Sequence, residues 1–188
     1  LQDAMINDID INVRSTFINS NGTKISNNQQ LFNKNPITGI AFTKNEAKIT
    51  LIGVMDRPGT AASIFKPLAD NQINVDMVVQ TSSSDGGQTD ITFTIIKDDI
   101  KNCIKILKEN KKISYKKIMY DDKVSKVSIV GAGMIATPGV TYRMFQALAK
   151  KKINIMVIST SEIKISVLVN KKNIKKAIRV LHKEFDLG

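Results

Sequence analysis

From residue 48 onward, the chain alternates between an apolar pattern typical of buried strands and one typical of amphipathic helices. Residues 49–54 form an apolar run that predicts a strand. Pro58 and Gly59 follow this run and indicate a sharp turn. Apolar side chains then recur at helical spacing at Ala61, Ala62, Phe65, Leu68 and Ala69. The pattern therefore predicts a strand, a tight loop and the N-terminus of a helix.

The same succession of motifs returns in the second half of the chain. Three pairs carry this internal repeat in the same order: Ile52-Gly53 with Val130-Gly131, Pro58-Gly59 with Pro138-Gly139, and Ile73-Asn74-Val75 with Ile153-Asn154-Ile155. The distance along the chain between matching residues is two residues greater for the last two pairs than for the first. The loop before Pro138-Gly139 is therefore predicted to be two residues longer than the loop before Pro58-Gly59. A repeat of this period indicates two copies of one folding unit.

Each copy is expected to contain strands and helices in the order βαββαβ. For copy one the pattern predicts strands at residues 48–54, 74–81, 89–96 and 114–120, and helices at 60–71 and 99–110. For copy two it predicts strands at 126–131, 154–160 and 164–169, and helices at 140–151 and 172–185. Asp98 or Asp99 is the expected N-cap of the second helix in copy one. This order places the chain in the α+β class, with two ferredoxin-like units.

Copy two lacks one strand, and a segment upstream of copy one can supply it. Residues 38–43 have the pattern of a short strand and are followed by a polar break at 44–46. Because an unpaired sheet edge is a liability, we expect residues 38–43 to complete the sheet of copy two. The first unit, residues 47–123, is then inserted into the second unit, residues 37–46 plus 124–188.

Residues 1–36 precede both units and show a different pattern. Residues 1–9 have the apolar spacing of a helix end, residues 11–18 alternate like a strand, and residues 19–23 predict a turn. The polar, Asn- and Gln-rich stretch 26–36 predicts a linker. We therefore expect a separate segment ahead of the repeat.

Pro67 conflicts with the first helical pattern, because it lies inside the predicted helix 60–71. Proline has no N–H group to donate to the carbonyl of Ser63 and its ring crowds the preceding turn. We expect Pro67 to bend or shorten this helix, at a cost of roughly 3 kcal/mol unless the surroundings absorb it.

The composition of the 188 residues excludes several classes of site. A hydrophobic content of 42% suffices for a hydrophobic core that needs no stabilising disulfide or metal site. Cys103 is the only cysteine and His182 the only histidine, so neither a disulfide framework nor a multi-cysteine metal site is expected. No apolar run approaches the ~20 residues of a membrane span, and the first residues are no secretory signal. We expect a cytoplasmic protein without metal or membrane partners.

The formal charge of +11 raises the question of nucleic-acid binding. The lysines occur as scattered doublets, most of them at predicted helix ends or on polar faces. Charges in such places favour solubility and need no ligand. We therefore expect no nucleic-acid partner.

The loop at residues 55–62 carries the chemistry of greatest interest. The first N–H groups of a helix lack internal partners, and the helix dipole favours an anion such as a carboxylate there. Asp56, just before the turn, can hold an ammonium group. A carboxylate site beside an ammonium site fits a free amino acid. The alternative is a plain strand-to-helix turn with Asp56 on the surface.

Longer stretches of the chain match a known family in order. They are residues 52–59, 73–80, 89–94, 120–122, 126–134 and 158–167. With these stretches, residues 48–188 resemble the regulatory region of aspartate kinases (aspartokinases), a tandem of ACT domains. Residues 13–17, with Gly22 and Thr23, are similar to the end of the family's catalytic domain, which makes residues 1–36 a remnant of that domain plus a linker.

The resemblance implies a regulatory role. The intact enzymes phosphorylate L-aspartate with ATP and Mg, which leads to lysine, threonine and methionine, and the ACT pair senses lysine, threonine or both. The family's Lys-Phe-Gly-Gly-Thr signature is not in this chain. We therefore expect no catalytic residues and no cofactor in the chain itself. The implied partners are amino-acid effectors, a second ACT pair in a homodimer, and an aspartate kinase catalytic domain or subunit.

The resemblance also assigns effector residues at two loops. At the threonine-like site, Gly59, Thr60 and Ala61 would offer N–H groups to the effector carboxylate, and Asp56 would take its ammonium. Gln80 would reach a side-chain hydroxyl, while Asn154 and Ile155 would contribute backbone from the facing unit. At the lysine-like site the assigned residues are Asp76, Gly139, Val140, Thr141, Ser161 and Glu162. Residues 135–137 depart from the Lys/Arg-Ser-His that the family often has there. The alternative is that the second copy has a purely structural role and binds no effector.

Two other functions remain open from the sequence. The chain could be a stand-alone ACT sensor or regulatory subunit. It could also be an RNA-binding protein, since the same order of elements builds RNA-recognition folds. Such folds need aromatic side chains on central strands, and the equivalent positions here, Ile49, Leu51, Phe93 and Val127, include one aromatic.

Overall fold

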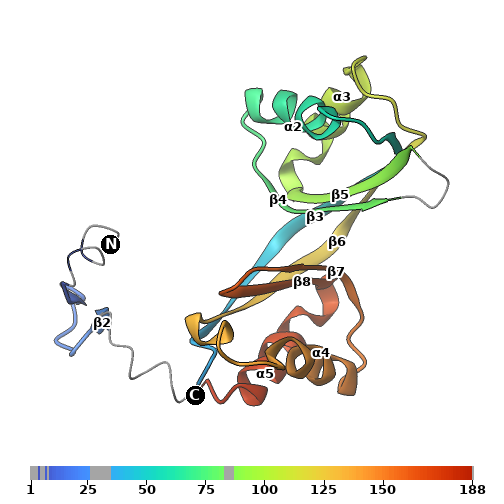
Figure 1. Cartoon of the computed structure of the whole chain (residues 1–188). Helices are drawn as coiled ribbons and strands as arrows, with labels where there is room; N and C mark the ends of the chain where they lie inside the picture. The colour runs from blue at the N-terminus through green and yellow to red at the C-terminus, as the bar shows by residue number, and fades with distance from the viewer. Residues whose placement is uncertain (1–3, 5–6, 8, 26–34, 83–86, 188) are drawn as a thin grey trace.

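Two long strands run through both halves of the molecule and organise its fold (Figure 1). Strand β3 spans Gly39–Met55 and strand β6 spans Lys117–Val130. They pair antiparallel, from Gly39 opposite Val130 to Ile52 opposite Lys117. The computed structural model describes residues 4, 7, 9–25, 35–82 and 87–187.

Four shorter strands complete a six-stranded sheet. They are β4 (Val75–Ser82), β5 (Gln88–Ile96), β7 (Ile155–Thr160) and β8 (Lys164–Asn170). The strand order is β4-β5-β3-β6-β8-β7, and every pair of neighbours is antiparallel. The outermost strands, β4 and β7, also approach each other. The sheet therefore bends back on itself, because its two ends come together.

Four helices cover the sheet in two pairs. They are α2 (Thr60–Asp70), α3 (Ile100–Glu109), α4 (Val140–Lys150) and α5 (Ile174–Glu184). Figure 1 shows α2 and α3 at one end of the molecule and α4 and α5 at the other, with the strands between. None of the described helices is long and apolar enough to cross a membrane.

Each pair of helices covers a separate hydrophobic core. One core joins α2 and α3 to the C-terminal half of β3, where Ala47, Ile49 and Leu51 are fully buried. The other joins α4 and α5 to β6 and β8 and also takes in Ile37, just before β3. The side chains along β3 are thus divided between two cores. The architecture is two βαββαβ units that share their two longest strands.

The pairing of residues 38–43 with the second unit is confirmed. Gly39 lies opposite Val130 and Phe42 opposite Val127, and the N–H of Thr38 donates to the carbonyl of Val130 at 2.8 Å. Gly131 permits this approach, since a Cβ atom on it would lie 2.0 Å from the carbonyl oxygen of Pro36.

The predicted polar break at 44–46 is wrong, because β3 continues through it. Glu46 is buried there and register shifts flank it on both sides. The predicted strands 114–120 and 126–131 likewise merge into the single strand β6. Polar residues continue these strands because they lie where the chain passes from one core to the other, outside both apolar interiors.

Two smaller predictions about the helices are borne out only in part. Asp99 is the N-cap residue of α3, but its side chain makes no capping hydrogen bond, and a short 3-10 turn, Lys97–Asp99, leads into the helix. Asp98 instead accepts a hydrogen bond from the amide of Asn45 at 3.1 Å. Pro67 does not shorten α2, which has 11 residues, as α4 has. The amide of Asn110 donates to the freed carbonyl of Ser63 at 2.9 Å, so Pro67 leaves no unpaired acceptor.

The segment before residue 37 forms a small hairpin. Strands β1 (Ile11–Val13) and β2 (Thr23–Ile25) pair antiparallel in a sheet of their own. The predicted strand 11–18 is therefore shorter than expected. Most of the predicted helix 1–9 and of the linker 26–36 lies outside the described residues.

Candidate functional site

The two units build their strand-to-helix loops in the same way. Gly59 has φ 89° and ψ −7° before α2, and Gly139 has φ 91° and ψ −5° before α4. L-residues with a side chain rarely adopt this left-handed conformation, so glycine is needed at both positions. Gly59 accepts from the N–H of Ser63 at 2.9 Å, and Gly139 from that of Arg143 at 3.0 Å. The repeat seen in the sequence is thus a repeat of backbone geometry.

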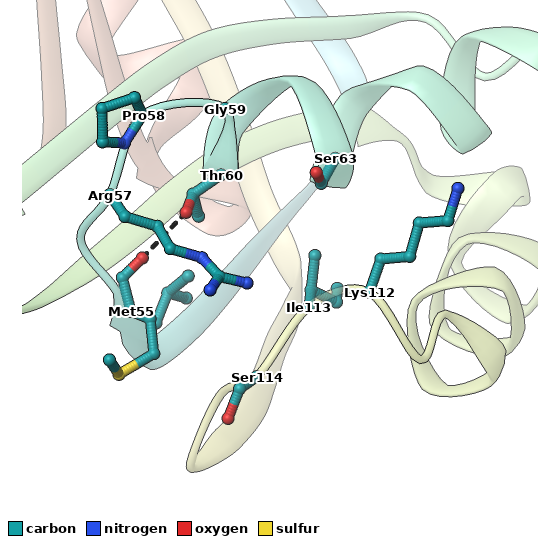
Figure 2. A pocket seen from close by; sticks show the side chains of 10 residues that line it. Met55, Arg57, Pro58, Gly59, Thr60, Ser63, Lys112, Ile113 and Ser114 are labelled. Atoms are coloured by element: carbon teal, nitrogen blue, oxygen red, sulfur yellow. Dashed lines mark hydrogen bonds between the residues drawn. The ribbon is translucent and has the colours of Figure 1, made fainter.

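The first loop borders a pocket of about 200 Å³ (Figure 2). The loop and the start of α2 form one wall, and the segment 112–114, between α3 and β6, forms another. In Figure 2 the side chains of Arg57 and Lys112 stand on opposite sides of this space, and the Thr60 hydroxyl donates to the Met55 carbonyl at 2.9 Å. The N-terminal end of α2 and the two cations favour an anionic group here.

Asp56 and Gln80 lie on another side of the same loop. The amide nitrogen of Gln80, on β4, is 3.4 Å from a carboxylate oxygen of Asp56, and both side chains are exposed. The N–H of Asp56 donates to the carbonyl of Gly87, which ties the loop to the start of β5. The structure thus brings together Asp56 and Gln80, which the resemblance assigns to one site, but neither residue lines the pocket.

The three backbone donors predicted at the first loop differ in their surroundings. The N–H of Thr60 is directed to the carbonyl of Arg57 at 3.2 Å. A Cβ atom on Gly59 would meet no neighbouring atom within 4 Å, so the space in front of it is open. Ala61 is exposed in the first turn of α2, where an N–H group has no partner within the helix.

The predicted residues of the second loop are spread over three elements. Gly139 precedes α4, Val140 is buried in the core of its unit, and Thr141 is exposed. Ser161 and Glu162 are exposed in the turn between β7 and β8. The N–H of Ser161 closes this turn by donating to the carbonyl of Lys164 at 2.7 Å.

Asp76, the sixth residue predicted for the second site, already has a partner within the chain. The ammonium of Lys126 contacts its carboxylate and also lies 2.8 Å from the carboxylate of Glu46. We call these three side chains the Lys126 cluster. The exposed fractions of Lys126 and Glu46 are only 16% and 7%, whereas that of Asp76 is 46%.

The charges in the Lys126 cluster stabilise one another. Partial burial raises the pKa of Asp76, but hydrogen bonds from Lys126 and from the Met77 N–H outweigh it, so the pKa falls below its ordinary value. Burial lowers the pKa of Lys126, but its hydrogen bonds to Asp76 and Glu46 outweigh that effect and raise this pKa. Asp76 and Lys126 therefore both stay charged through neutral pH.

Asn154 and Ile155 belong to the second unit, whereas Asp56 and Gln80 belong to the first. They lie where α4 leads into β7, in the second unit. Within the described part of the chain, no hydrogen bond or ion pair links either residue to Asp56 or Gln80.

Sequence reasoning missed the cations of the site. Arg57 stands inside the quoted motif and could have been noticed as a partner for an anion. Lys112 belongs to one of the lysine doublets for which the sequence suggested no ligand, and only the fold places it beside the first loop and α2. Lys126 meets Asp76 across strands far apart in the chain, so no local pattern could reveal their contact. Among the described residues, no group of His, Cys, Asp and Glu could hold a metal ion.

The two βαββαβ units, with their shared strands and matching loops, can be compared with known domain families. The sequence profile of the ACT domain matches residues 49–110 and 127–185, one match in each unit. The chain is therefore a protein with two ACT domains.

Comparison with whole proteins narrows this class. The aspartokinase of Corynebacterium glutamicum is 44% identical over 184 residues, which are 96% of this chain and 44% of that enzyme. A crystal structure of aspartokinase alpha and beta subunits has 47% identity and a TM-score of 0.73, covering 80% of this chain and 99% of the other. The ligand-free regulatory subunit of aspartate kinase from Thermus thermophilus gives 36% identity, the same TM-score and the same coverage.

The chain belongs to the aspartokinase family and corresponds to its regulatory region. It spans less than half the length of the curated enzymes that it matches.

Proposed function

We propose that this chain is the feedback-sensing region of an aspartate kinase that binds lysine, threonine or both. The observation that carries the proposal is the loop before α2, where a helix N-terminus and the Asp56–Gln80 pair stand beside each other. The helix N-terminus can bind a carboxylate, and the Asp56–Gln80 pair can bind an ammonium and a hydroxyl. A free amino acid with a hydroxyl side chain carries all three groups.

In the proposed threonine-like site, the backbone at Gly59, Thr60 and Ala61 receives the effector carboxylate. Arg57 and Lys112 add positive charge from the adjacent pocket. Asp56 binds the α-ammonium and Gln80 binds the side-chain hydroxyl. Asn154 and Ile155 complete the site from the facing unit of a second chain, which makes a homodimer part of the proposal.

The proposed lysine-like site uses the second loop. Gly139, Val140 and Thr141 are proposed to offer backbone groups, and Ser161 and Glu162 to contribute side chains from the β7–β8 turn. An enclosed ε-ammonium needs a carboxylate, which Glu162 supplies without rearrangement because it is exposed. Asp76 can serve there only if Lys126 releases it.

At the level of the whole enzyme, we propose that effector binding controls phosphorylation of L-aspartate by ATP with Mg in a catalytic domain or subunit outside this chain. Residues 1–36 are proposed to be the end of that catalytic domain plus a linker. We also propose unit boundaries at 47–123 and at 37–46 plus 124–188, which agree with the two separate cores. The chain itself is proposed to have neither catalytic activity nor a cofactor.

A second candidate is a separate regulatory subunit without a covalently linked kinase. It is favoured by one observation, namely that residues of this chain cover 99% of the Thermus thermophilus regulatory subunit. The RNA-binding alternative loses its support, because Phe93 is fully buried and packs edge-to-face against Phe65, 5.3 Å between ring centroids. Its ring cannot stack on a base.

Calorimetric titration of the chain with threonine, lysine and methionine tests the proposal. We expect threonine or lysine to bind, and Asp56→Ala to weaken threonine binding about tenfold, since an ammonium loses its charged partner. Gln80→Ala should weaken threonine more than an amino acid without a hydroxyl.

Asp70→Ala is the matched control for this titration. Asp70 is an exposed carboxylate on α2 that pairs with Lys66 one turn away, so its loss should leave binding unchanged. The proposal fails if neither threonine nor lysine binds at millimolar concentration, or if Asp70→Ala weakens binding as much as Asp56→Ala.

A further inference from the structure

Within the Lys126 cluster, the Asp76–Lys126 ion pair joins two strands that are not neighbours in the sheet. Lys126 lies on β6, Glu46 on β3 and Asp76 on the edge strand β4, and β4 is separated from β6 by β5 and β3. In its own register Lys126 pairs with Thr43 and Leu168, so it belongs to the half of β6 that serves the second unit. The Asp76–Lys126 ion pair therefore connects the first unit to the second across the bend of the sheet.

The backbone of β4 is shaped around this contact. A register shift interrupts the β4–β5 ladder between Asp76 and Val79, and Met77 there has φ 47°, a left-handed conformation in a residue with a side chain. The Met77 N–H donates to the Asp76 carboxylate at 2.7 Å, and the Thr94 hydroxyl donates to the Asp76 carbonyl at 3.1 Å. Bulges of this kind redirect a side chain, and here the bulge accompanies a carboxylate that reaches the second unit.

The same strand carries Gln80, the residue that meets Asp56 at the first loop. Asp76 and Gln80 are four positions apart, which is about 13 Å along a strand. Asp76 and the first loop are thus linked along β4 by one short segment, which contains the bulge between Asp76 and Val79. β4 also approaches β7, so the second unit constrains it at two places.

We propose that Lys126 is a positioning residue, which holds β4 through Asp76 and thereby sets the effector affinity of the first loop. The first part of the inference, that Lys126 holds β4, stands by itself. The second part, that it sets effector affinity, rests on the proposed function. The inference gives Asp76 a role in the ligand-free chain, as the internal partner of Lys126, that the expectation of an effector contact did not include. Glu46 keeps the ammonium in place, because it is more deeply buried than Asp76 and contacts the same nitrogen.

Hydrogen exchange of the ligand-free chain tests the first half of the inference. In Lys126→Met we expect amides of residues 75–81 to exchange at least tenfold faster, while amides of α4 and α5 keep their wild-type rates. Lys123→Met is the control, because Lys123 is exposed on the same strand. Lys126→Arg should restore slow exchange, since it keeps a cation at this position. Unchanged exchange in β4 would overturn the proposal.

Titration of the same variants with threonine tests the second half. We expect several-fold weaker binding in Lys126→Met, wild-type affinity in Lys123→Met, and partial or full recovery in Lys126→Arg. Equal affinity in Lys126→Met and wild type would refute the link between the cluster and the loop. If the wild-type chain binds no amino acid, the proposed function fails, whereas the exchange rates of β4 still decide the role of Lys126.

Asp76→Asn provides the same tests if Lys126→Met does not fold. It removes the negative charge of the more exposed partner and leaves Lys126 paired with Glu46. Faster exchange in β4 and weaker threonine binding would support the inference. Wild-type values of both would contradict it.

Discussion

Individual glycines explain why the repeat is visible in the sequence. Gly59 and Gly139 adopt nearly identical left-handed conformations before equivalent helices, so each copy needs a residue without a side chain there. Gly131 is needed for another reason, because it lies against the backbone of residues 36–37 in an extended conformation, with φ 175°. Turn chemistry is local, so the sequence predicted these loops well.

Alanine substitutions separate the two roles of glycine. Gly59→Ala should lower the free energy of unfolding by about 1–2 kcal/mol, the cost of a left-handed alanine, because its Cβ atom meets open space. Gly131→Ala should cost more, since its Cβ atom would overlap the Pro36 carbonyl oxygen. Urea unfolding of both variants measures the difference. A larger loss in Gly59→Ala than in Gly131→Ala would contradict this account.

Contacts between individual residues that are distant in the chain could not be predicted from the sequence. Asp76 was expected to meet an effector because its chemistry suits an ammonium, and the ammonium that it meets is that of Lys126. The contact of Asp76 with an effector stays a prediction, and within the chain its carboxylate is paired with Lys126. A carboxylate attracts any nearby cation, and only the fold decides which cation is near.

Among the elements, α2 shows how tertiary contacts override local propensity. Pro67 removes a hydrogen bond inside the helix, yet α2 keeps the length of α4 because Asn110 supplies a donor to Ser63 from the end of α3. The sequence placed the proline correctly in the helix. It could not show the compensating amide, which lies more than one element away.

A double-mutant cycle between Pro67 and Asn110 tests this compensation. Asn110→Ala should lower stability by about 1–2 kcal/mol, because the partly buried Ser63 carbonyl loses the side-chain donor that replaces the N–H missing at Pro67. In the Pro67→Ala background the same change should cost less, since residue 67 then offers its own N–H to Ser63. Thermal or urea unfolding of the four proteins gives the coupling energy. Strict additivity would show that the two residues act independently.

At the scale of the whole molecule, the strands β3 and β6 make the two units one structure. The pattern correctly predicted which strands belong to which copy and that residues 38–43 pair with the second unit. It divided β3 and β6 at polar segments, because polar residues usually interrupt strands. In this fold they mark the passage between two cores, and Glu46 is buried there with an ion partner.

The Lys126 cluster should give stability a defined pH dependence. The lowered pKa of Asp76 contributes stability above its unfolded value of about 3.9, which is lost as the pH falls through the folded pKa. The raised pKa of Lys126 contributes stability below its unfolded value of about 10.4, which is lost as the pH rises through the folded pKa.

Unfolding of wild type and Lys126→Met across pH measures this contribution. We expect a difference of about 3 kcal/mol near neutral pH, because the buried Glu46 is left unpaired. The difference should be constant between roughly pH 5 and 9.5 and shrink outside that window. A difference that does not vary from pH 2 to 11 would mean that packing of the lysine stem, and not its charge, stabilises the fold.

The interleaved path of the chain has a consequence for its synthesis. Residues 39–43 leave the ribosome first, but their partners at 126–130 are made only after the whole inserted unit. At about 5–20 residues per second, this early segment waits several seconds with its backbone groups unpaired. During that interval the inserted unit can condense around its own core, whereas the enclosing one cannot. The nascent polypeptide should therefore mature from the inside outward, and the exposed early segment is where a chaperone would be needed.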